Sequence, residues 1–196
     1  SQTQSCPLGT YGTSVGAVGI ETCISADPGY YVDSTGASSQ LECIAGTYNP
    51  VIGAISSADC LAADAGNYVE SSGSSEQTPC DLGTYQPNSG QIFCLESSSG
   101  TYVSNTGSSS VSDCSEGTYQ PNSGQSECID ASPGYFSSSV RASAQTPCLA
   151  GSYQPDTGSV TCLQADVGYH VPIEGQNMQT ICPAGQYQPQ PSSTEC

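Results

Sequence analysis

The sequence predicts a small disulfide-rich fold, mostly irregular with short β-hairpins and no helix of note, arranged as an elongated tandem-repeat rod. Three observations predict it. Twelve cysteines are spread evenly through 196 residues, and the distances between them repeat. Only 29 residues are Leu, Ile, Val or Phe, which is too few for one large core. With a net charge of −17 such a chain would stay disordered unless disulfides ordered it.

Two alternating segments account for the cysteine spacing. A short segment reads C-x-x-G-x-Y, then a loop, then C, and occurs six times; a long segment of constant length separates the copies. The short segments open at Cys6, Cys43, Cys80, Cys114, Cys148 and Cys182. Together the two segments form a unit of 34 residues, or 37 in the first two copies, whose short segments have longer loops. Fixed internal periods of this size are typical of repeat proteins.

The repeat predicts the division of the chain. A lead at 1–5 precedes five repeats and a terminal half repeat. The repeats are predicted at 6–42, 43–79, 80–113, 114–147 and 148–181, with the half repeat at 182–196.

Each segment is predicted to be a small hairpin. Aromatic and β-branched pieces such as 29–32 and 101–103 suit strands, while Pro-Asn-Ser-Gly at 87–90 and 121–124 suits turns. Two to three residues per strand form no stable sheet alone, so disulfides and the next repeat must support them. We expect the in-frame Gly to allow a close backbone approach or a positive φ. The Tyr rings are expected to pack on the disulfides and on neighbouring units.

The charge balance excludes several function classes. Arg141 is the only Lys or Arg, so neither a nucleic acid nor an anionic membrane surface is an expected partner. No segment approaches the roughly 20 apolar residues of a membrane span, so direct membrane insertion is not expected. A structural disulfide set implies an oxidising compartment, and we therefore expect an extracellular or cell-surface protein.

The sequence offers no catalytic, cofactor or metal site. His170, the only histidine, stands at an aromatic position of the repeat and is expected to replace a Tyr ring. Asp27, Asp64 and Asp166 each follow a cysteine by four residues, and other acidic residues directly precede cysteines. Calcium needs six to eight converging oxygens, which this pattern does not supply, so a solvated acidic face is expected. We predict that the protein is not an enzyme.

Serine runs in the long segments are candidate O-glycosylation sites. None of the asparagines lies in an N-x-S/T sequon. Exposed Ser/Thr-rich loops can either carry O-linked sugar or remain plain polar loops, and composition favours neither. The candidate residues are Ser97, Ser98, Ser99, Ser108, Ser109, Ser110, Ser137, Ser138 and Ser139.

Two disulfide schemes respect the repeat. Either each short segment closes on itself, or each long segment closes and leaves Cys6 and Cys196 over, free to pair between copies. We favour the first because it uses all twelve cysteines within one chain. A closed loop of about 15 residues contributes roughly 3 kcal/mol. The favoured pairs are Cys6–Cys23, Cys43–Cys60, Cys80–Cys94, Cys114–Cys128, Cys148–Cys162 and Cys182–Cys196.

The C-x-x-G-x-Y…C motif resembles the first half-module of tumour-necrosis-factor-receptor-type cysteine-rich domains. It also resembles the cysteine-rich repeats of ephrin-receptor-like extracellular proteins. In the receptor modules the two cysteines of the motif pair with each other, which the resemblance therefore implies here. The implied fold is an elongated ladder of β-turns and short strands. The long segments depart from the receptor pattern, which has further cysteine pairs.

Two functions compete. Near-identical units favour a structural extracellular protein, a disulfide-stapled repeat rod that forms or decorates a fibre, appendage or cell-surface layer. The alternative is a receptor or adhesin ectodomain, for which the atypical stretch 171–178 is the candidate site. Both ends carry a short segment, so the expected partner is the protein itself, by head-to-tail assembly or by continuation in a longer repeat chain. Glycans are further candidate partners.

The short-segment pairing predicts six self-closed loops. Peptide mapping of the unreduced protein with a protease that does not depend on Lys or Arg should yield six cross-linked species, one from each short segment. A peptide linking Cys23 to Cys43 would rule the scheme out.

Overall fold

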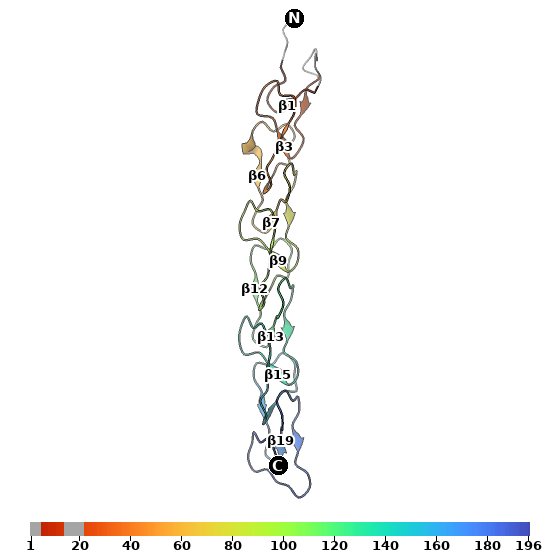
Figure 1. Cartoon of the computed structure of the whole chain (residues 1–196). Coiled ribbons are helices and arrows are strands. Elements are labelled where there is room, and N and C mark those ends of the chain that lie inside the picture. Colours follow the sequence, from red (N-terminus) through yellow and green to blue (C-terminus); the bar gives the residue numbers. More distant parts are fainter. Residues whose placement is uncertain (1–4, 14–21) are drawn as a thin grey trace. The chain divides into compact units, whose positions relative to one another are not determined.

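The computed structural model describes residues 5–13 and 22–196. The chain folds as two compact units. Unit 1 comprises Ser1–Leu95 and Asn105–Ser110, and unit 2 comprises Glu96–Ser104 and Val111–Cys196. Within unit 1, β1, β3 and β7 follow one another along the chain, as β13, β15 and β19 do within unit 2 (Figure 1).

The described residues form ten two-stranded sheets, each from two strands that are consecutive in the chain. Every strand is two residues long. The strands are β1 (Thr10–Tyr11), β2 (Ile24–Ser25), β3 (Tyr30–Tyr31), β4 (Leu41–Glu42), β5 (Thr47–Tyr48), β6 (Leu61–Ala62), β7 (Asn67–Tyr68), β8 (Thr78–Pro79), β9 (Thr84–Tyr85), β10 (Leu95–Glu96), β11 (Thr101–Tyr102), β12 (Ser112–Asp113), β13 (Thr118–Tyr119), β14 (Ile129–Asp130), β15 (Tyr135–Phe136), β16 (Thr146–Pro147), β17 (Ser152–Tyr153), β18 (Leu163–Gln164), β19 (Tyr169–His170) and β20 (Thr180–Ile181). The described residues contain no α-helix, only the 3-10 turn η2 (Ser57–Asp59), which confirms the predicted small, mostly irregular repeat fold of short hairpins. None of the helical structure that is described could cross a membrane.

Local hydrogen bonds explain why C-x-x-G-T begins the first four short segments. In the fourth short segment, the backbone N–H and the hydroxyl of Thr118 both donate to the carbonyl oxygen of Ser115, at 3.1 and 2.8 Å. This closes a tight turn whose Gly117 has a φ of +85°. Tyr119 then pairs with Ile129, the residue directly after the second cysteine. An aromatic residue facing an aliphatic one is a favourable cross-strand pair.

Six disulfides close the short segments. Each joins the first cysteine of a short segment to its last, with Cα–Cα distances of 5.6 to 5.8 Å. The pairs are Cys6–Cys23, Cys43–Cys60, Cys80–Cys94, Cys114–Cys128, Cys148–Cys162 and Cys182–Cys196. Each bond therefore ties the start of one hairpin to the segment that follows it.

Successive segments are joined by backbone hydrogen bonds at the in-frame glycines. Gly117 donates its N–H to the carbonyl oxygen of Ser137 at 2.7 Å, and its own carbonyl accepts the N–H of Ala131 at 2.9 Å. A Cβ added to Gly117 would overlap the carbonyl oxygen of Gly158. Gly158 in turn donates its N–H to the carbonyl oxygen of Ala131 at 2.8 Å. The backbones at Ala131, Ser137 and Gly158 therefore all lie against Gly117, where no side chain fits.

The same crossing recurs within each unit. In unit 1, a Cβ on Gly46 would overlap the carbonyl oxygen of Gly90, and Gly46 donates its N–H to the carbonyl oxygen of Val69 at 2.8 Å. The repetition shows that the in-frame Gly serves the close backbone approach expected of it.

The buried interior is small and partly polar. Its apolar members are four half-cystines with alanines and valines. The fully buried residues of this kind include Cys43, Cys80, Cys114, Cys148, Ala63, Ala131, Val69 and Val171. The in-frame Tyr rings are half-buried at the edge of this interior, so they complete it without forming its centre. Tyr187 is exposed.

A buried glutamine spans the short loops of the third, fourth and fifth copies. Gln120 is only 2% exposed. Its Nε2 donates to the carbonyl oxygen of Glu127 at 2.9 Å, and its Oε1 accepts the N–H of Asn122 at 3.0 Å. Gln86 and Gln154 make the equivalent pairs of bonds. The side chain holds the two sides of the loop together, as a short stretch of sheet would.

We predict that a methyl group on Gly117 costs far more stability than one on Gly158. Both residues have positive φ, so Ala strains either position by about 1 kcal/mol. Only at Gly117 does the methyl also meet a backbone oxygen, which should add roughly 1–3 kcal/mol. Denaturant unfolding of Gly117→Ala and Gly158→Ala, followed by circular dichroism, measures the difference. Equal losses would show that the crossing is not tight.

We also predict that Gln120→Leu lowers the free energy of unfolding by about 2 kcal/mol, because two hydrogen bonds at a buried site are lost without a change in volume. Gln188→Leu is the matched control, since Gln188 makes the same two bonds at an exposed site where water can replace them. Thermal unfolding of the two variants should separate them. A control as unstable as Gln120→Leu would contradict the argument.

Candidate functional site

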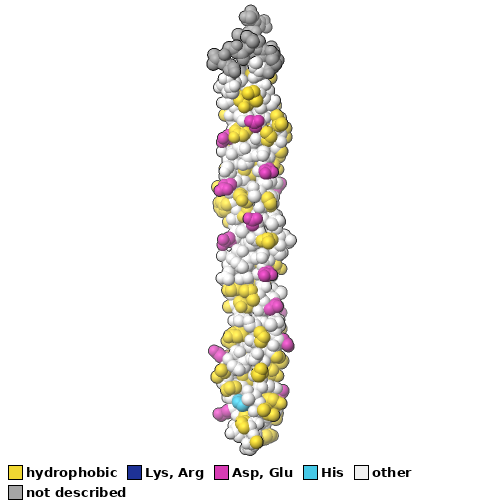
Figure 2. Space-filling model, turned by 90° about the vertical axis from the view of Figure 1, so that its right-hand side faces the viewer, with side chains coloured by type: hydrophobic (Ala, Val, Ile, Leu, Met, Phe, Trp, Pro, Cys, Tyr) yellow, Lys and Arg dark blue, Asp and Glu magenta, His cyan; other side chains and the backbone are white. Residues whose placement is uncertain are grey.

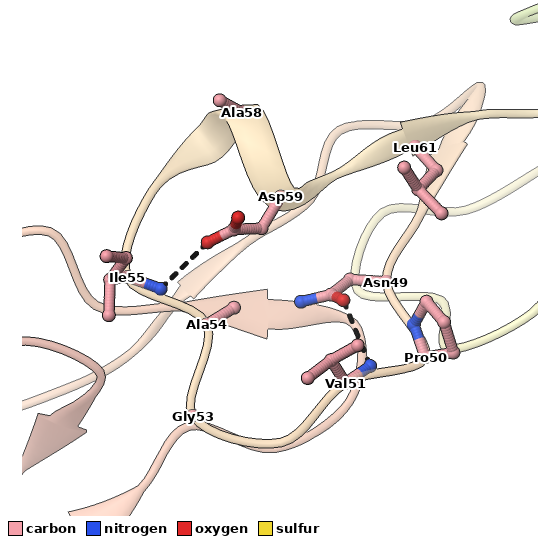
Figure 3. Close-up of a pocket in the computed structure, with 9 residues that line it drawn as sticks. All are labelled: Asn49, Pro50, Val51, Gly53, Ala54, Ile55, Ala58, Asp59 and Leu61. Carbon is pink, nitrogen blue, oxygen red and sulfur yellow. Dashed lines mark hydrogen bonds between the residues drawn. The ribbon is translucent and has the colours of Figure 1, made fainter.

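The longer second short segment forms a hollow in unit 1. Its three extra residues lengthen the loop between Cys43 and Cys60, which carries η2. The hollow has a volume of about 410 Å³. Figure 3 shows the lining residues: Asn49, Pro50, Val51, Gly53, Ala54, Ile55, Ala58, Asp59 and Leu61.

Asp59 fixes the shape of the loop. Its carboxylate accepts the N–H groups of Ile55 and Ser56 at 2.9 and 3.1 Å, while the Ser56 hydroxyl accepts the N–H of Ala58 at 3.1 Å. This reciprocal arrangement is a capping box, which begins η2. Asn49 holds the other side: its Oδ1 accepts the N–H of Val51 at 3.0 Å (Figure 3).

The hollow is suited to apolar contact. Val51 and Ile55 are 59% and 51% exposed, and Leu61 is exposed beside them. The polar side chains of the lining are already engaged, since Asn49 also donates to the carbonyl oxygen of Tyr30 at 3.2 Å. Among the lining residues, no nucleophile lies against a general base. The hollow can therefore receive an apolar side chain of a partner, and its residues show no arrangement for catalysis.

The acidic residues considered for calcium are parts of a structural clamp. Gln40 accepts the backbone N–H of Asp27 through Oε1 at 2.8 Å and donates through Nε2 to the Asp27 carboxylate at 2.9 Å. Gln77 clamps Asp64 and Gln179 clamps Asp166 in the same way. Each clamp ties residues 13 apart in one long segment. The recurrence of Asp at this position thus has a structural reason.

The single cation also has a local role. Arg141 has a φ of +64°, at a turn position where most other repeats have Gly. Its Nε lies 3.8 Å from Asp113 Oδ1, and both side chains are exposed. A solvated pair of this kind contributes little to stability.

His170 lies against the last disulfide. Its Nδ1 is 3.0 Å from Cys196 Sγ, and both residues are half-buried. Among the described residues, His170, Cys182 and Cys196 are a group with metal-ligand atoms within 4.8 Å of one another. The two sulfurs are joined in a disulfide and lack the thiolate charge that binds a metal. His170 therefore takes a ring position of the repeat, as its place in the sequence predicts.

Burial corrects part of the glycosylation prediction. Ser97 and Ser137 are buried, and their hydroxyls donate to the carbonyl oxygens of Gln125 and Thr118 at 3.3 and 2.9 Å. A sugar does not fit at either position, because neither hydroxyl is accessible to solvent. Ser108 is half-buried. The exposed candidates, which stay predictions, are Ser98, Ser99, Ser109, Ser110, Ser138 and Ser139.

The atypical stretch 171–178 takes a regular place in the stack. Val171 is buried and accepts the N–H of Gly151 at 2.8 Å, and Gly175 donates to the carbonyl oxygen of Cys148 at 2.8 Å. Ile173 and Met178 are exposed. Its unusual sequence leaves the backbone contacts of the repeat unchanged.

Comparison with known proteins identifies one related family. Residues 66–114 match the family described as tyrosine-protein kinase ephrin type A/B receptor-like. The match covers a quarter of the chain, centred on the short segment Cys80–Cys94. It confirms that the cysteine-rich repeat resembles ephrin-receptor-like modules. The resemblance to tumour-necrosis-factor-receptor-type domains stays a prediction. A search of curated proteins finds no significant match.

The matched family is a receptor-type cysteine-rich module and not a catalytic domain. Together with six disulfides, it indicates a disulfide-rich domain of the extracellular or cell-surface type.

Proposed function

We propose that this protein is a structural extracellular protein, a disulfide-stapled repeat rod that forms or decorates a fibre, appendage or cell-surface layer. The observation that carries the proposal is the recurrent backbone crossing. In both units, a turn residue donates to a carbonyl 27 or 30 residues earlier, as Gly73 does to Cys43 and Gly158 does to Ala131. Contacts of this kind use backbone atoms, so the same joint can be repeated without limit along one axis.

Two glycines mark the face on which a further repeat would stack. A Cβ on Gly168 or Gly185 meets nothing within 4 Å, whereas the equivalent Gly134 and Gly151 lie directly against the carbonyl oxygens of Gly175 and Ser192. The positive φ of Gly168 and Gly185 is retained. This face has the form that receives the turn of a further repeat, from a second copy or a continuation of the chain. A head-to-tail joint of such faces does not close on itself and extends as a filament.

The surface charge limits how such filaments would associate. The net charge is −17, and Figure 2 shows Asp and Glu side chains spread over the visible face among exposed hydrophobic ones. Like charge opposes side-by-side contact at low ionic strength, and salt screens it. We expect thin single fibres at low salt that thicken as salt is added.

A receptor or adhesin ectodomain is the second candidate. The hollow at Asn49–Leu61 favours it, because it distinguishes this repeat from the three repeats that follow and offers exposed Val51 and Ile55 to a partner. In that case the stacked repeats would present the hollow, and the protein would stay monomeric without its ligand.

Small-angle scattering and negative-stain microscopy over a range of concentration and salt test the proposal. We expect rods that lengthen with concentration. Gly168→Ala places a methyl on the joining face and should abolish lengthening, while Gly158→Ala, equally strained but in ordinary contact with its neighbours, should assemble normally. A monomeric rod under all conditions would favour the receptor function. A compact particle, with a radius of gyration near roughly 16 Å, would contradict both.

A further inference from the structure

His170 stands at a position where the other repeats have a hydrocarbon or phenol ring. It is the eighth residue after the cysteine that opens its long segment, and its counterparts are Tyr31, Tyr68, Tyr102 and Phe136. In three earlier repeats this ring shares a surface hollow with the last cysteine of the next short segment: Tyr31 with Cys60, Tyr68 with Cys94, and Tyr102 with Cys128. The fold therefore places this side chain beside a disulfide, whatever its chemistry.

At His170 that chemistry changes. Strand β19 pairs His170 with Thr180, two residues before Cys182, which fixes the ring against the disulfide. Its Nδ1 is 3.0 Å from Cys196 Sγ, and the nitrogen and both sulfurs lie within 4.8 Å of one another. An imidazole N–H at this distance can donate a hydrogen bond to sulfur, which neither Phe nor a Tyr ring edge can do.

We propose that the Cys182–Cys196 disulfide is a thiol-exchange site, with His170 as its positioning donor. An external thiolate attacks Cys182 Sγ and forms a mixed disulfide. The bond between the two cysteine sulfurs breaks, and its electron pair leaves on Cys196 Sγ as a thiolate. The His170 N–H stabilises this departing thiolate, and a better leaving group speeds the exchange. In the reverse step the Cys196 thiolate attacks Cys182 Sγ and releases the external thiolate.

The other disulfides lack the imidazole, an exposed first cysteine, or both. The first cysteines Cys43, Cys80, Cys114 and Cys148 are buried although their partners are half-buried, whereas Cys182 is half-buried. Cys6 and Cys23 are also half-buried, but His170 is the only histidine in the chain. The Cys6–Cys23 disulfide therefore matches the proposed site in exposure and differs in the imidazole. A further repeat stacked on this face would cover Cys182 as the turn at Gly175 covers Cys148, so the exchange is expected in chains whose last repeat is free.

Reaction with reduced glutathione tests the proposal. Samples of the full chain are quenched with iodoacetamide at intervals and mapped by mass spectrometry. We expect Cys182–Cys196 to open about tenfold faster than Cys6–Cys23. His170→Tyr, which restores the residue of the other repeats, should bring the two rates together. Tyr102→His is the matched control: it places an imidazole beside Cys128, but the sulfur to be attacked, that of Cys114, is buried, so the rate of opening of Cys114–Cys128 should not change.

The proposal requires slower opening of Cys182–Cys196 in His170→Tyr and an unchanged rate at Cys114–Cys128 in Tyr102→His. Circular dichroism of each variant shows whether the fold is retained, and His170→Phe, which has the ring found at Phe136, takes the place of a His170→Tyr chain that unfolds. An unchanged rate in a folded His170→Tyr chain would show that exposure alone opens the bond. Earlier opening of another disulfide in the wild-type protein would overturn the assignment outright.

Discussion

The close crossing of backbone over backbone at the in-frame glycines is the constraint on which this structure depends. At Gly117 the N–H, the carbonyl and the α-carbon each meet a different stretch of chain, those of Ser137, Ala131 and Gly158. Contacts between backbones need no particular side chain elsewhere. For this reason a chain with only 29 Leu, Ile, Val and Phe residues can order itself, and its other positions are free to be polar or acidic.

The interior follows from that constraint. Segments that approach so closely leave room for sulfur, Ala and Val, and for amides that satisfy backbone groups, but not for large apolar side chains. The side chains of Gln120 and of the Asp27–Gln40 clamp thus supply hydrogen bonds that the backbones of longer strands supply in larger sheets. No buried side-chain nitrogen or oxygen among the described residues lacks a hydrogen-bond partner. A polar interior is stable only when its buried polar groups are hydrogen-bonded in this way.

The candidate sites were only partly predictable. The Gln that follows each Tyr in the later short segments is visible as a recurrence, yet a polar residue beside Pro and Asn is typical of an exposed turn, so its burial was missed. The three extra residues before Cys60 suggest an insertion in an exposed loop without a function. The hollow forms because the loop folds around the Asp59 carboxylate, which the sequence does not show. Ser97 and Ser98 are adjacent serines in one run, but stacking buries the first and exposes the second.

The sequence by itself determined the class of the protein. Regular cysteine spacing, scarce apolar residues and turn chemistry are local properties, and they are sufficient to predict short hairpins in a disulfide-rich repeat of the extracellular type. The tertiary structure decided which distant atoms meet. Gly117 lies against Gly158, and His170 against Cys196, 26 residues away. Such pairs depend on how one hairpin stacks on the next. That stacking is set by the backbone geometry of the hairpins. It therefore cannot be read from the sequence pattern of a single segment.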